Sequence, residues 1–162
     1  MNYLSPLAML YKWEQEKPNE IYLSQPIDGI WHNWTWAETG QEVRKMAAYL
    51  RSLNLPAQSK IGLLSKNCAH WVMTDFAIMM AGHISVPLYP NLNSDTLAKI
   101  LRHSETKLLF VGKLDGFANM KAGIPADMPC ITFPFYSEDY PKWDDLTLTI
   151  SPMKENIIRE EK

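Results

Sequence analysis

Three short apolar runs alternate with two helical patterns between residues 60 and 112 of this 162-residue chain. The runs KIGLLS, ISVPLY and KLLFVG have the length and composition of buried strands. Residues 69–81 are apolar around most of a helix, while Leu97, Ile100 and Leu101 form one inner stripe. Because parallel strands need crossover connections, the alternation predicts right-handed β-α-β units. We therefore expect an α/β fold with a mostly parallel sheet flanked by helices.

Turn and capping signals set the limits of the elements before residue 60. Ser5 followed by Pro6 is typical of a helix start. The turn PIDG divides EIYLSQPIDGIWHNWTW, which predicts a small β-hairpin near the N-terminus. TWAE has the spacing of a capping box and opens a second helix. We expect its apolar stripe to be Val43, Met46, Ala47, Leu50 and Leu53, and Arg44, Lys45 and Arg51 to lie off that stripe.

The later helices are expected to be capped by Asn67, and by Asn93 or Ser94. Beyond Gly112, DGFANMKAGIPADMP predicts a short helix and a loop, CITFPF a fourth strand, and YSEDYPKWDDL an exposed connection. We expect the final SPMKENIIREEK to have no partner in this chain. The predicted organisation is an α/β domain at residues 1–150, followed at 151–162 by a connection to a missing remainder.

Composition and charge exclude several classes of function. The formal net charge is −2, and Lys and Arg are scattered among acids, so we expect no nucleic-acid partner and no polybasic membrane patch. Charged and polar residues interrupt residues 62–90, which cannot span a bilayer. The N-terminus lacks the basic start and unbroken apolar core of a secretion signal. With Cys68 and Cys130 expected as buried free thiols, a cytoplasmic location is predicted.

Residues that could carry chemistry are scattered rather than clustered. FVGKLDG has one glycine before its lysine, so a strand exit is favoured over a phosphate loop. We expect the methionines Met73, Met79 and Met80 to fill the core, with a docking face for a missing domain as the alternative. No metal or catalytic site is predicted from the histidines His32, His70, His83 and His103, nor from the acids Glu138, Asp139, Asp144 and Asp145, which are expected in a solvated loop.

Two polar stretches follow predicted parallel strands directly. They are SKN at residues 65–67 and YPN at residues 89–91. Ligands of open α/β sheets bind beyond the carboxyl ends of the strands. Topology therefore makes this edge the candidate binding region.

The helix WTWAETGQEVRKMAAYL and the segment from SKNCAHWVM through VPLYP to LLFVG resemble the AMP-forming acyl-CoA synthetase and adenylating-enzyme superfamily. The similarity covers about residues 6–145 and is most like bacterial long-chain fatty-acid–CoA ligases. It implies ATP-dependent activation of a carboxylate to an acyl-adenylate, followed by acyl transfer to CoA. The parent enzyme would use ATP, Mg²⁺ and CoA.

The family's phosphate-binding loop and its C-terminal lid lysine have no counterpart in this chain. The resemblance therefore implies an N-terminal fragment whose partner is the remainder of the ligase. Such a fragment is expected to bind none of these cofactors by itself and to be inactive, because the groups that neutralise phosphate charge are absent.

The resemblance also implies a CoA contact. In some relatives, the segment after the strand resembling VPLYP lies near the CoA nucleotide; the corresponding residues here are Tyr89, Pro90 and Asn91. Tyr89 is expected to stack on adenine. The alternative is that Tyr89 packs at the sheet edge. Pro90 and Asn91 stand where those relatives carry glycines.

Two other classes of function compete with the ligase fragment. One is a standalone, non-catalytic binding or scaffold module of the same fold. The segment ENIIREEK argues against it, because Ile157 and Ile158 stand beside charges as though leading into another strand. The other is a flavodoxin-like domain, which would need a phosphate loop where SKNCAH offers only Ser65. With its sheet unfinished, the fragment is also expected to self-associate through exposed apolar surface.

Overall fold

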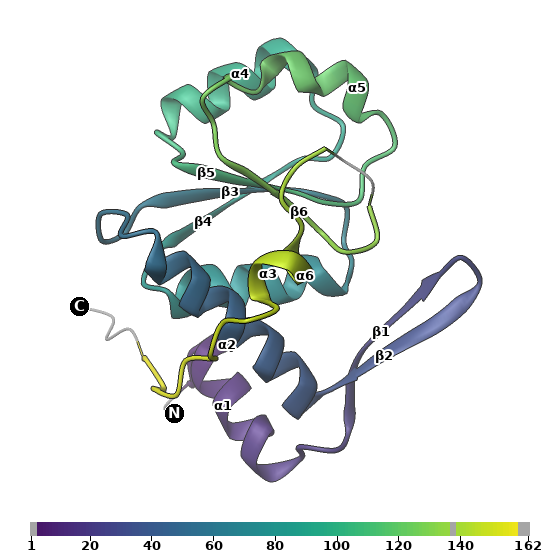
Figure 1. The fold of residues 1–162 in the computed structure, drawn as a ribbon, viewed down its shortest axis with the longest axis vertical. Helices are drawn as coiled ribbons and strands as arrows, with labels where there is room; N and C mark the ends of the chain where they lie inside the picture. Colours follow the sequence, from purple (N-terminus) through teal and green to yellow (C-terminus); the bar gives the residue numbers. More distant parts are fainter. Residues whose placement is uncertain (1–2, 137–138, 159–162) are drawn as a thin grey trace.

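A four-stranded parallel sheet forms the centre of the molecule (Figure 1). The computed structural model describes residues 3–136 and 139–158. The strands, in the spatial order β4-β3-β5-β6, are β4 (Ile84–Leu88), β3 (Lys60–Leu64), β5 (Leu108–Val111) and β6 (Cys130–Thr132). All neighbouring pairs are parallel, so the expected α/β fold and its fourth strand are confirmed.

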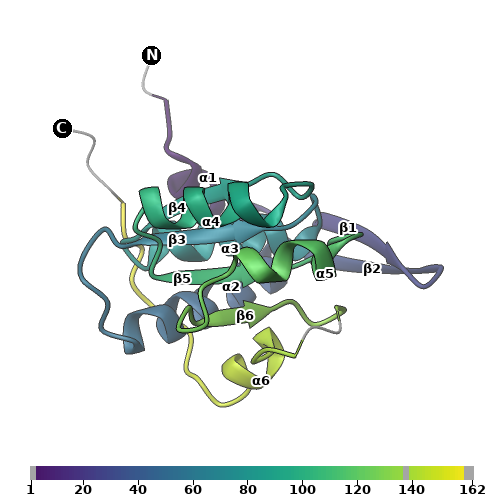
Figure 2. The same cartoon turned by 90° about the horizontal axis from the view of Figure 1, so that it is seen from above.

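Helices cover both faces of this sheet. On one face lie α4 (Ser94–His103), α5 (Phe117–Met120) and the 3-10 turn η1 (Lys121–Gly123), which Figure 2 shows over the strands. On the other face lie α2 (Trp36–Ser52) and α3 (Ala69–Met80), with α1 (Pro6–Glu16) packed on α2. None of the helices in the described residues is both long enough and apolar enough to cross a membrane.

The strands supply side chains to two separate cores, because successive residues of a strand point to opposite faces. Ile61, Leu63 and Phe110 pack with α1, α2 and α3. Leu64 and Leu109 pack with α4 and α5. The alternation explains why the short strands read as continuous apolar runs: both faces of the sheet are covered.

The capping predictions hold except at one helix. Ser5 caps α1, Thr35 and Glu38 form the capping box of α2, and Asn93 caps α4. The prediction that Asn67 caps α3 is wrong, because Cys68 occupies the N-cap position and makes no side-chain cap bond.

The first amide of α3 is instead satisfied from a distant strand. Gln25 Oε1 accepts a hydrogen bond of 2.7 Å from the Ala69 N–H, and Gln25 Nε2 donates to the Tyr136 hydroxyl at 3.1 Å. Gln25 lies on β1 (Ile21–Ile27), a strand of the N-terminal hairpin, so one side chain joins the hairpin, α3 and the loop after β6.

The predicted hairpin is present as β1 (Ile21–Ile27) and β2 (Ile30–Thr35), which project from the body of the molecule (Figure 1). Asp28 and Gly29 have φ values of 51° and 80°, as a two-residue hairpin turn with two left-handed positions requires. Ile30 and Trp31 near its tip are 66% and 65% exposed.

The expectation of a buried second strand is wrong for most of β4. This strand lies at the sheet edge, and only Leu88 within it is buried. Pro87 suits an edge strand, because proline has no N–H to donate, whereas a central strand must form hydrogen bonds with neighbours on both sides.

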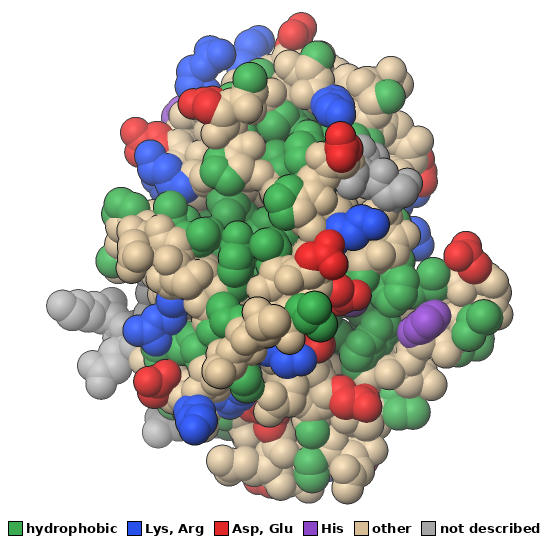
Figure 3. Space-filling model, in the orientation of Figure 1, with side chains coloured by type: hydrophobic (Ala, Val, Ile, Leu, Met, Phe, Trp, Pro, Cys, Tyr) green, Lys and Arg blue, Asp and Glu red, His purple; other side chains and the backbone are tan. Residues whose placement is uncertain are grey.

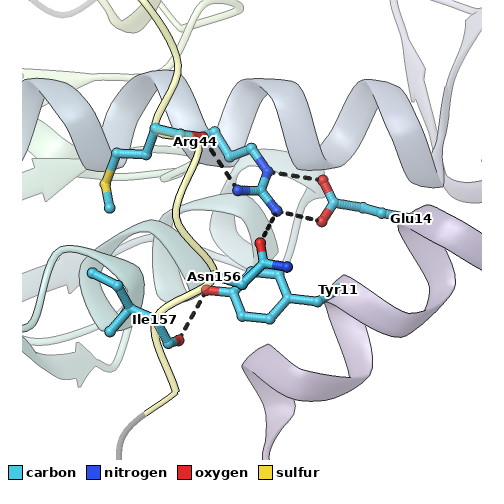
Figure 4. Close-up of polar contacts among 6 residues, drawn as sticks. Tyr11, Glu14, Arg44, Asn156 and Ile157 are labelled. Carbon is cyan, nitrogen blue, oxygen red and sulfur yellow. Dashed lines mark hydrogen bonds and ion pairs between the residues drawn. The ribbon is translucent and has the colours of Figure 1, made fainter.

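The C-terminal segment does have partners in this chain, which corrects the opposite expectation. Met153 is buried, and its N–H donates to the Arg44 carbonyl oxygen at 3.2 Å. The Tyr11 hydroxyl donates to the Ile157 carbonyl oxygen at 3.0 Å (Figure 4). Residues 151–158 therefore lie against α1 and α2.

Arg44 was predicted to lie off the apolar stripe of α2, and the structure shows that it is nevertheless buried and holds this arrangement together. It is 9% exposed, and its guanidinium donates to both carboxylate oxygens of Glu14, to the Met153 carbonyl and to Asn156 Oδ1 (Figure 4). Gly40 makes room for the pair, because an added Cβ there would lie 1.8 Å from Glu14 Oε1. Leu53, expected in the apolar stripe, lies past the end of α2 and is 37% exposed.

The acidic stretch at residues 136–146 is not simply an exposed connection. It contains α6 (Trp143–Thr147), and Trp143 is fully buried. The Trp143 indole N–H donates to Glu42 Oε2 at 2.9 Å, which anchors α6 on α2. Asp139, Asp144 and Asp145 are exposed as expected, while Glu138 lies outside the described residues.

Candidate functional site

The candidate site lies where three parallel strands end together. Leu64 on β3 is in register with Leu88 on β4 and Val111 on β5. The segments that follow these three residues therefore meet at one edge of the sheet. This is the edge that open α/β sheets use for ligands.

A hollow of about 660 Å³ opens at this edge. Its wall combines the end of β4, the start of α4 and the loop before α5. The residues that line it are Lys66, Tyr89, Pro90, Asn91, Leu92, Asn93, Asp115, Gly116, Asn119 and Met120. All three residues predicted from the sequence thus lie on the wall of a single hollow.

The loops behind the hollow are tied together by Ser65. Its side chain is 3% exposed; the hydroxyl accepts from the Lys113 N–H at 2.9 Å and donates to the Lys66 carbonyl at 2.7 Å. The Lys66 N–H in turn donates to the Lys113 carbonyl at 2.8 Å. A Cβ on Gly112 would lie 2.5 Å from Ser65 Oγ, so the glycine of FVGKLDG serves this close packing.

Charge at the opening comes from two side chains that reach across it. Lys66 follows β3, and its ammonium forms an ion pair with the Asp115 carboxylate from the loop after β5. Both side chains are substantially exposed, at 40% and 77%. The pair is therefore weak enough for an incoming anion to compete for Lys66.

Tyr89 stands between two hollows. Its side chain is 76% exposed, so it does not pack at the sheet edge, which was the alternative reading. Together with Pro90 it also lines a second hollow of about 320 Å³, shared with Trp71 and Asn67. An aromatic ring in this position is free to stack on a flat ligand.

The cysteines are unsuited to nucleophilic chemistry. Both are free, Cys130 is buried and Cys68 is half-buried. Burial raises the pKa of the Cys68 thiol and raises that of Cys130 to about 11. Since the thiolate is the nucleophile, both are held in the unreactive form at neutral pH.

The histidines are dispersed through the structure. His70 and His83 are each 4% exposed, and desolvation lowers the pKa of His70 to about 4. Nowhere in residues 3–136 and 139–158 do three His, Cys, Asp or Glu side chains gather as metal ligands would. The hollow at the strand ends is lined instead by an aromatic ring, a cation and asparagine amides, which are groups that can bind a ligand.

Sequence reasoning missed Asp115 and Asn119 as lining residues. Lys66 was in the stretch SKN at a strand end, but its partner lies 49 positions further along the chain. A polar residue after the third strand was the available signal, since the same edge rule applies to every parallel strand.

Residues 10–156 match the model of the family described as AMP-binding enzyme. The chain belongs to this family.

Among its curated relatives, the long-chain-fatty-acid–CoA ligase FadD15 of Mycobacterium bovis is 30% identical over 124 residues, covering 76% of this chain and 20% of the relative. A peroxisomal butyrate–CoA ligase of Arabidopsis thaliana is 35% identical over 108 residues, covering 67% of this chain and 18% of that enzyme. The chain thus spans about a fifth of the length of these relatives.

Solved structures agree on the fold. A crystal structure of the anthranilate CoA ligase AuaEII, in complex with anthranoyl-AMP, has a TM-score of 0.78 at 19% identity, covering 98% of this chain and 30% of that one. A benzoate CoA ligase from Burkholderia xenovorans has a TM-score of 0.76 at 17% identity, covering 94% and 30%.

Proposed function

We propose that this chain forms the N-terminal α/β part of an ATP-dependent, AMP-forming acyl-CoA ligase, and that it is inactive without the remainder of that enzyme. The parent would activate a carboxylate as an acyl-adenylate and then transfer the acyl group to CoA. The observation that carries the proposal is the family match over residues 10–156, together with relatives of which the matching segment covers only about a fifth.

We further propose a long-chain fatty acid as the substrate of the parent, because the FadD15 relatives carry that name. Other relatives are named for butyrate and benzoate, so chain length must be measured. A cytoplasmic location is part of the proposal, although several plant relatives are named peroxisomal.

CoA is the one ligand that we assign to this chain, at Tyr89, Pro90 and Asn91. The residues present fit it: an exposed aromatic ring stands at a hollow of about 660 Å³, beside the ammonium of Lys66. Tyr89 would stack on the adenine, and Lys66 would exchange Asp115 for a phosphate. ATP and Mg²⁺ are assigned to the remainder, since the described residues gather no set of metal ligands.

The first experiment is ATP–pyrophosphate exchange by the 162-residue chain, with fatty acids from butyrate to palmitate. No exchange above the protein-free background is expected, because the family's phosphate-binding loop and lid lysine, which would neutralise phosphate charge in the transition state, have no counterpart in this chain. The complete ligase serves as the positive control, and clear turnover by the chain alone would reject the proposal.

The second experiment tests the CoA contact in the complete ligase. Tyr89→Ala should raise the KM for CoA by about tenfold, given a typical stacking contribution of about 1–3 kcal/mol per base, and should leave pyrophosphate exchange unchanged. Tyr22→Ala is the matched control, because this half-buried tyrosine stacks on Trp36 far from the hollow. An unchanged KM for CoA in the Tyr89 variant removes the assignment.

One observation favours the alternative, a binding or scaffold module of the same fold. Residues 151–158 pack against α1 and α2 through Arg44 and Tyr11 instead of extending away. Calorimetry of the 162-residue chain with CoA separates the two readings. Tight, saturable binding by the chain alone supports the module, whereas binding that appears only in the complete ligase supports the ligase part.

A further inference from the structure

A third hollow, of about 260 Å³, lies away from the CoA site, where the hairpin meets α2, α3 and α6. It opens beside Pro134 and Phe135, just beyond the end of β6, and so belongs to the same ligand-binding edge of the sheet. Figure 3 shows a histidine on the hairpin, with apolar side chains between it and the body of the molecule. The lining residues are His32, Asn33, Trp34, Glu42, His70, Pro134, Phe135 and Asp144.

Four of these residues form a continuous aromatic wall. The rings of His32, Trp34, His70 and Phe135 have neighbouring centroids between 5.2 and 6.4 Å apart. The rings come from β2, α3 and the loop after β6, so three separate parts of the chain build the wall. Aromatic faces attract cations as well as hydrocarbon, because the ring quadrupole is negative on its face.

His70 is the least expected member of this wall. It is only 4% exposed, yet its imidazole makes no hydrogen bond to any residue that the structure describes. Desolvation holds its pKa at about 4, so the ring is neutral at pH 7 and carries one nitrogen with a free lone pair. Neither ring nitrogen of His70 is among the fully buried atoms without a partner, so the free nitrogen is reachable from the hollow, where a ligand that donates a hydrogen bond fits it.

Asp144 supplies negative charge to the same hollow. Partial burial of this otherwise exposed side chain, together with the charges of Glu42 and Asp145, raises the pKa of its carboxyl, while the nearby ammonium of Lys45 lowers it. Glu42 is already engaged, by Trp143 Nε1 at 2.9 Å and by Lys45 at 3.4 Å. Within the described part of the chain Asp144 makes no ion pair, so its carboxylate is available to a cation.

We propose that this hollow binds a small primary alkylammonium ion, whose N–H groups would donate to Asp144 and to the His70 ring nitrogen and whose alkyl group would lie on Trp34 and Phe135. A primary ammonium carries three N–H donors and one positive charge, which matches two acceptors beside an aromatic wall. The site is separate from the proposed CoA contact and does not depend on the ligase assignment.

Two other occupants fit less well. A carboxylate such as a fatty acid would place a second anion beside Asp144 and Glu42, which like-charge repulsion disfavours. A metal ion would need at least three suitable ligands in reach, and the described residues contain no such group.

The test uses the 162-residue chain and n-butylammonium chloride as the probe, followed by NMR of the His70 ring protons and the Trp34 indole N–H. Saturable shifts at both side chains are expected in the millimolar range. Asp144→Asn should weaken the apparent affinity about fivefold, the upper range for a partly exposed ion pair. Asp145→Asn removes the same charge from the next residue of α6, outside the lining, and should change the affinity less than twofold.

Sodium hexanoate and tetramethylammonium chloride show whether binding depends on the positive charge and on the N–H donors of the ligand, and not only on its alkyl group. Hexanoate should produce no shift at His70, and tetramethylammonium, which has no N–H, should bind at least several-fold more weakly than butylammonium. The proposal is overturned if butylammonium leaves both side chains unshifted, if hexanoate shifts them instead, or if the two aspartate variants weaken binding equally.

Discussion

The buried guanidinium of Arg44 connects three parts of the chain, α1, α2 and residues 153–156, through its hydrogen bonds. Its partner Glu14 is nearly as well covered, with side-chain exposures of 10% and 13%. Removing one member of such a pair leaves the other charge buried without compensation, which costs more than the intact pair contributes.

Arg44→Met should therefore lower the free energy of unfolding by about 3 kcal/mol, measured by urea denaturation. Lys45→Met is the control on the same helix, because the Lys45–Glu42 pair is more exposed and should matter by less than about 1 kcal/mol. The double variant Glu14→Leu/Arg44→Met should recover part of the loss. Equal effects of the Arg44 and Lys45 variants would contradict the account.

His70 makes a second residue-scale prediction, about pH. Its pKa in the folded chain is about 4, below the ordinary 6.5, so the unfolded chain binds the proton first as pH falls. The stability that this group contributes is complete above about pH 6.5 and is lost between there and pH 4. From about pH 7 to about pH 5 the loss should be about 2 kcal/mol.

The comparison that checks this is urea unfolding of the wild-type chain and of His70→Gln at both pH values. The variant has no imidazole to protonate and should show a shallower pH dependence. His103→Gln, at the C-terminal end of α4, is the control and should keep the wild-type slope. Parallel slopes in wild type and His70→Gln would refute the prediction.

At the scale of elements, the order of helices and strands could be predicted from the sequence, whereas the side-chain contacts that connect one element to another could not. Short apolar runs predicted the sheet strands, helical spacing of apolar residues predicted α2 and α4, and an almost wholly apolar segment predicted α3, because each of these patterns is local in the sequence. Trp143 and Met153 sit in polar surroundings in the sequence, and what buries them lies about a hundred positions away. Of the candidate site, strand ends predicted Tyr89, Pro90 and Asn91, while Asp115 required the folded loop.

Gln25 is the clearest case of a joint between elements, because it caps α3 from the hairpin. Gln25→Ala should lower the free energy of unfolding by about 1–2 kcal/mol, since the buried Ala69 N–H would lose its acceptor. Amide hydrogen exchange at the start of α3 should accelerate. Ser24→Ala is the control on the same strand as Gln25. It removes an exposed hydrogen bond to Asn33 of β2 and should lower the free energy of unfolding by less than about 0.5 kcal/mol.

At the scale of the whole molecule, the hairpin is the part whose apolar side chains are least covered by the rest of the chain. Isolated two-stranded hairpins are marginal in water, and this one exposes Ile21, Ile30 and Trp31. In the separate four-stranded sheet, β4 is an edge strand, and its outer edge has no neighbouring strand among the described residues. Apolar patches and open edges both favour association.

We therefore predict that the 162-residue chain self-associates, with a mass that rises with concentration in light scattering and with measurable binding of a hydrophobic dye. Trp31→Ser combined with Ile30→Thr should shift the chain toward the monomer. Leu148→Ser, at a residue that is 81% exposed after α6, is the control and should leave the mass unchanged. A wild-type chain that stays monomeric with low dye binding would contradict the prediction.

The contact between Tyr11 and Ile157 joins residues 146 positions apart. A ribosome makes the chain from its N-terminus. The Tyr11 hydroxyl of the first helix therefore has no Ile157 carbonyl to bond until almost all of this segment has been translated. Until then the surface of the first two helices that residues 151–158 later cover stays open to solvent, so the growing polypeptide is accessible to chaperones and proteases for a long interval.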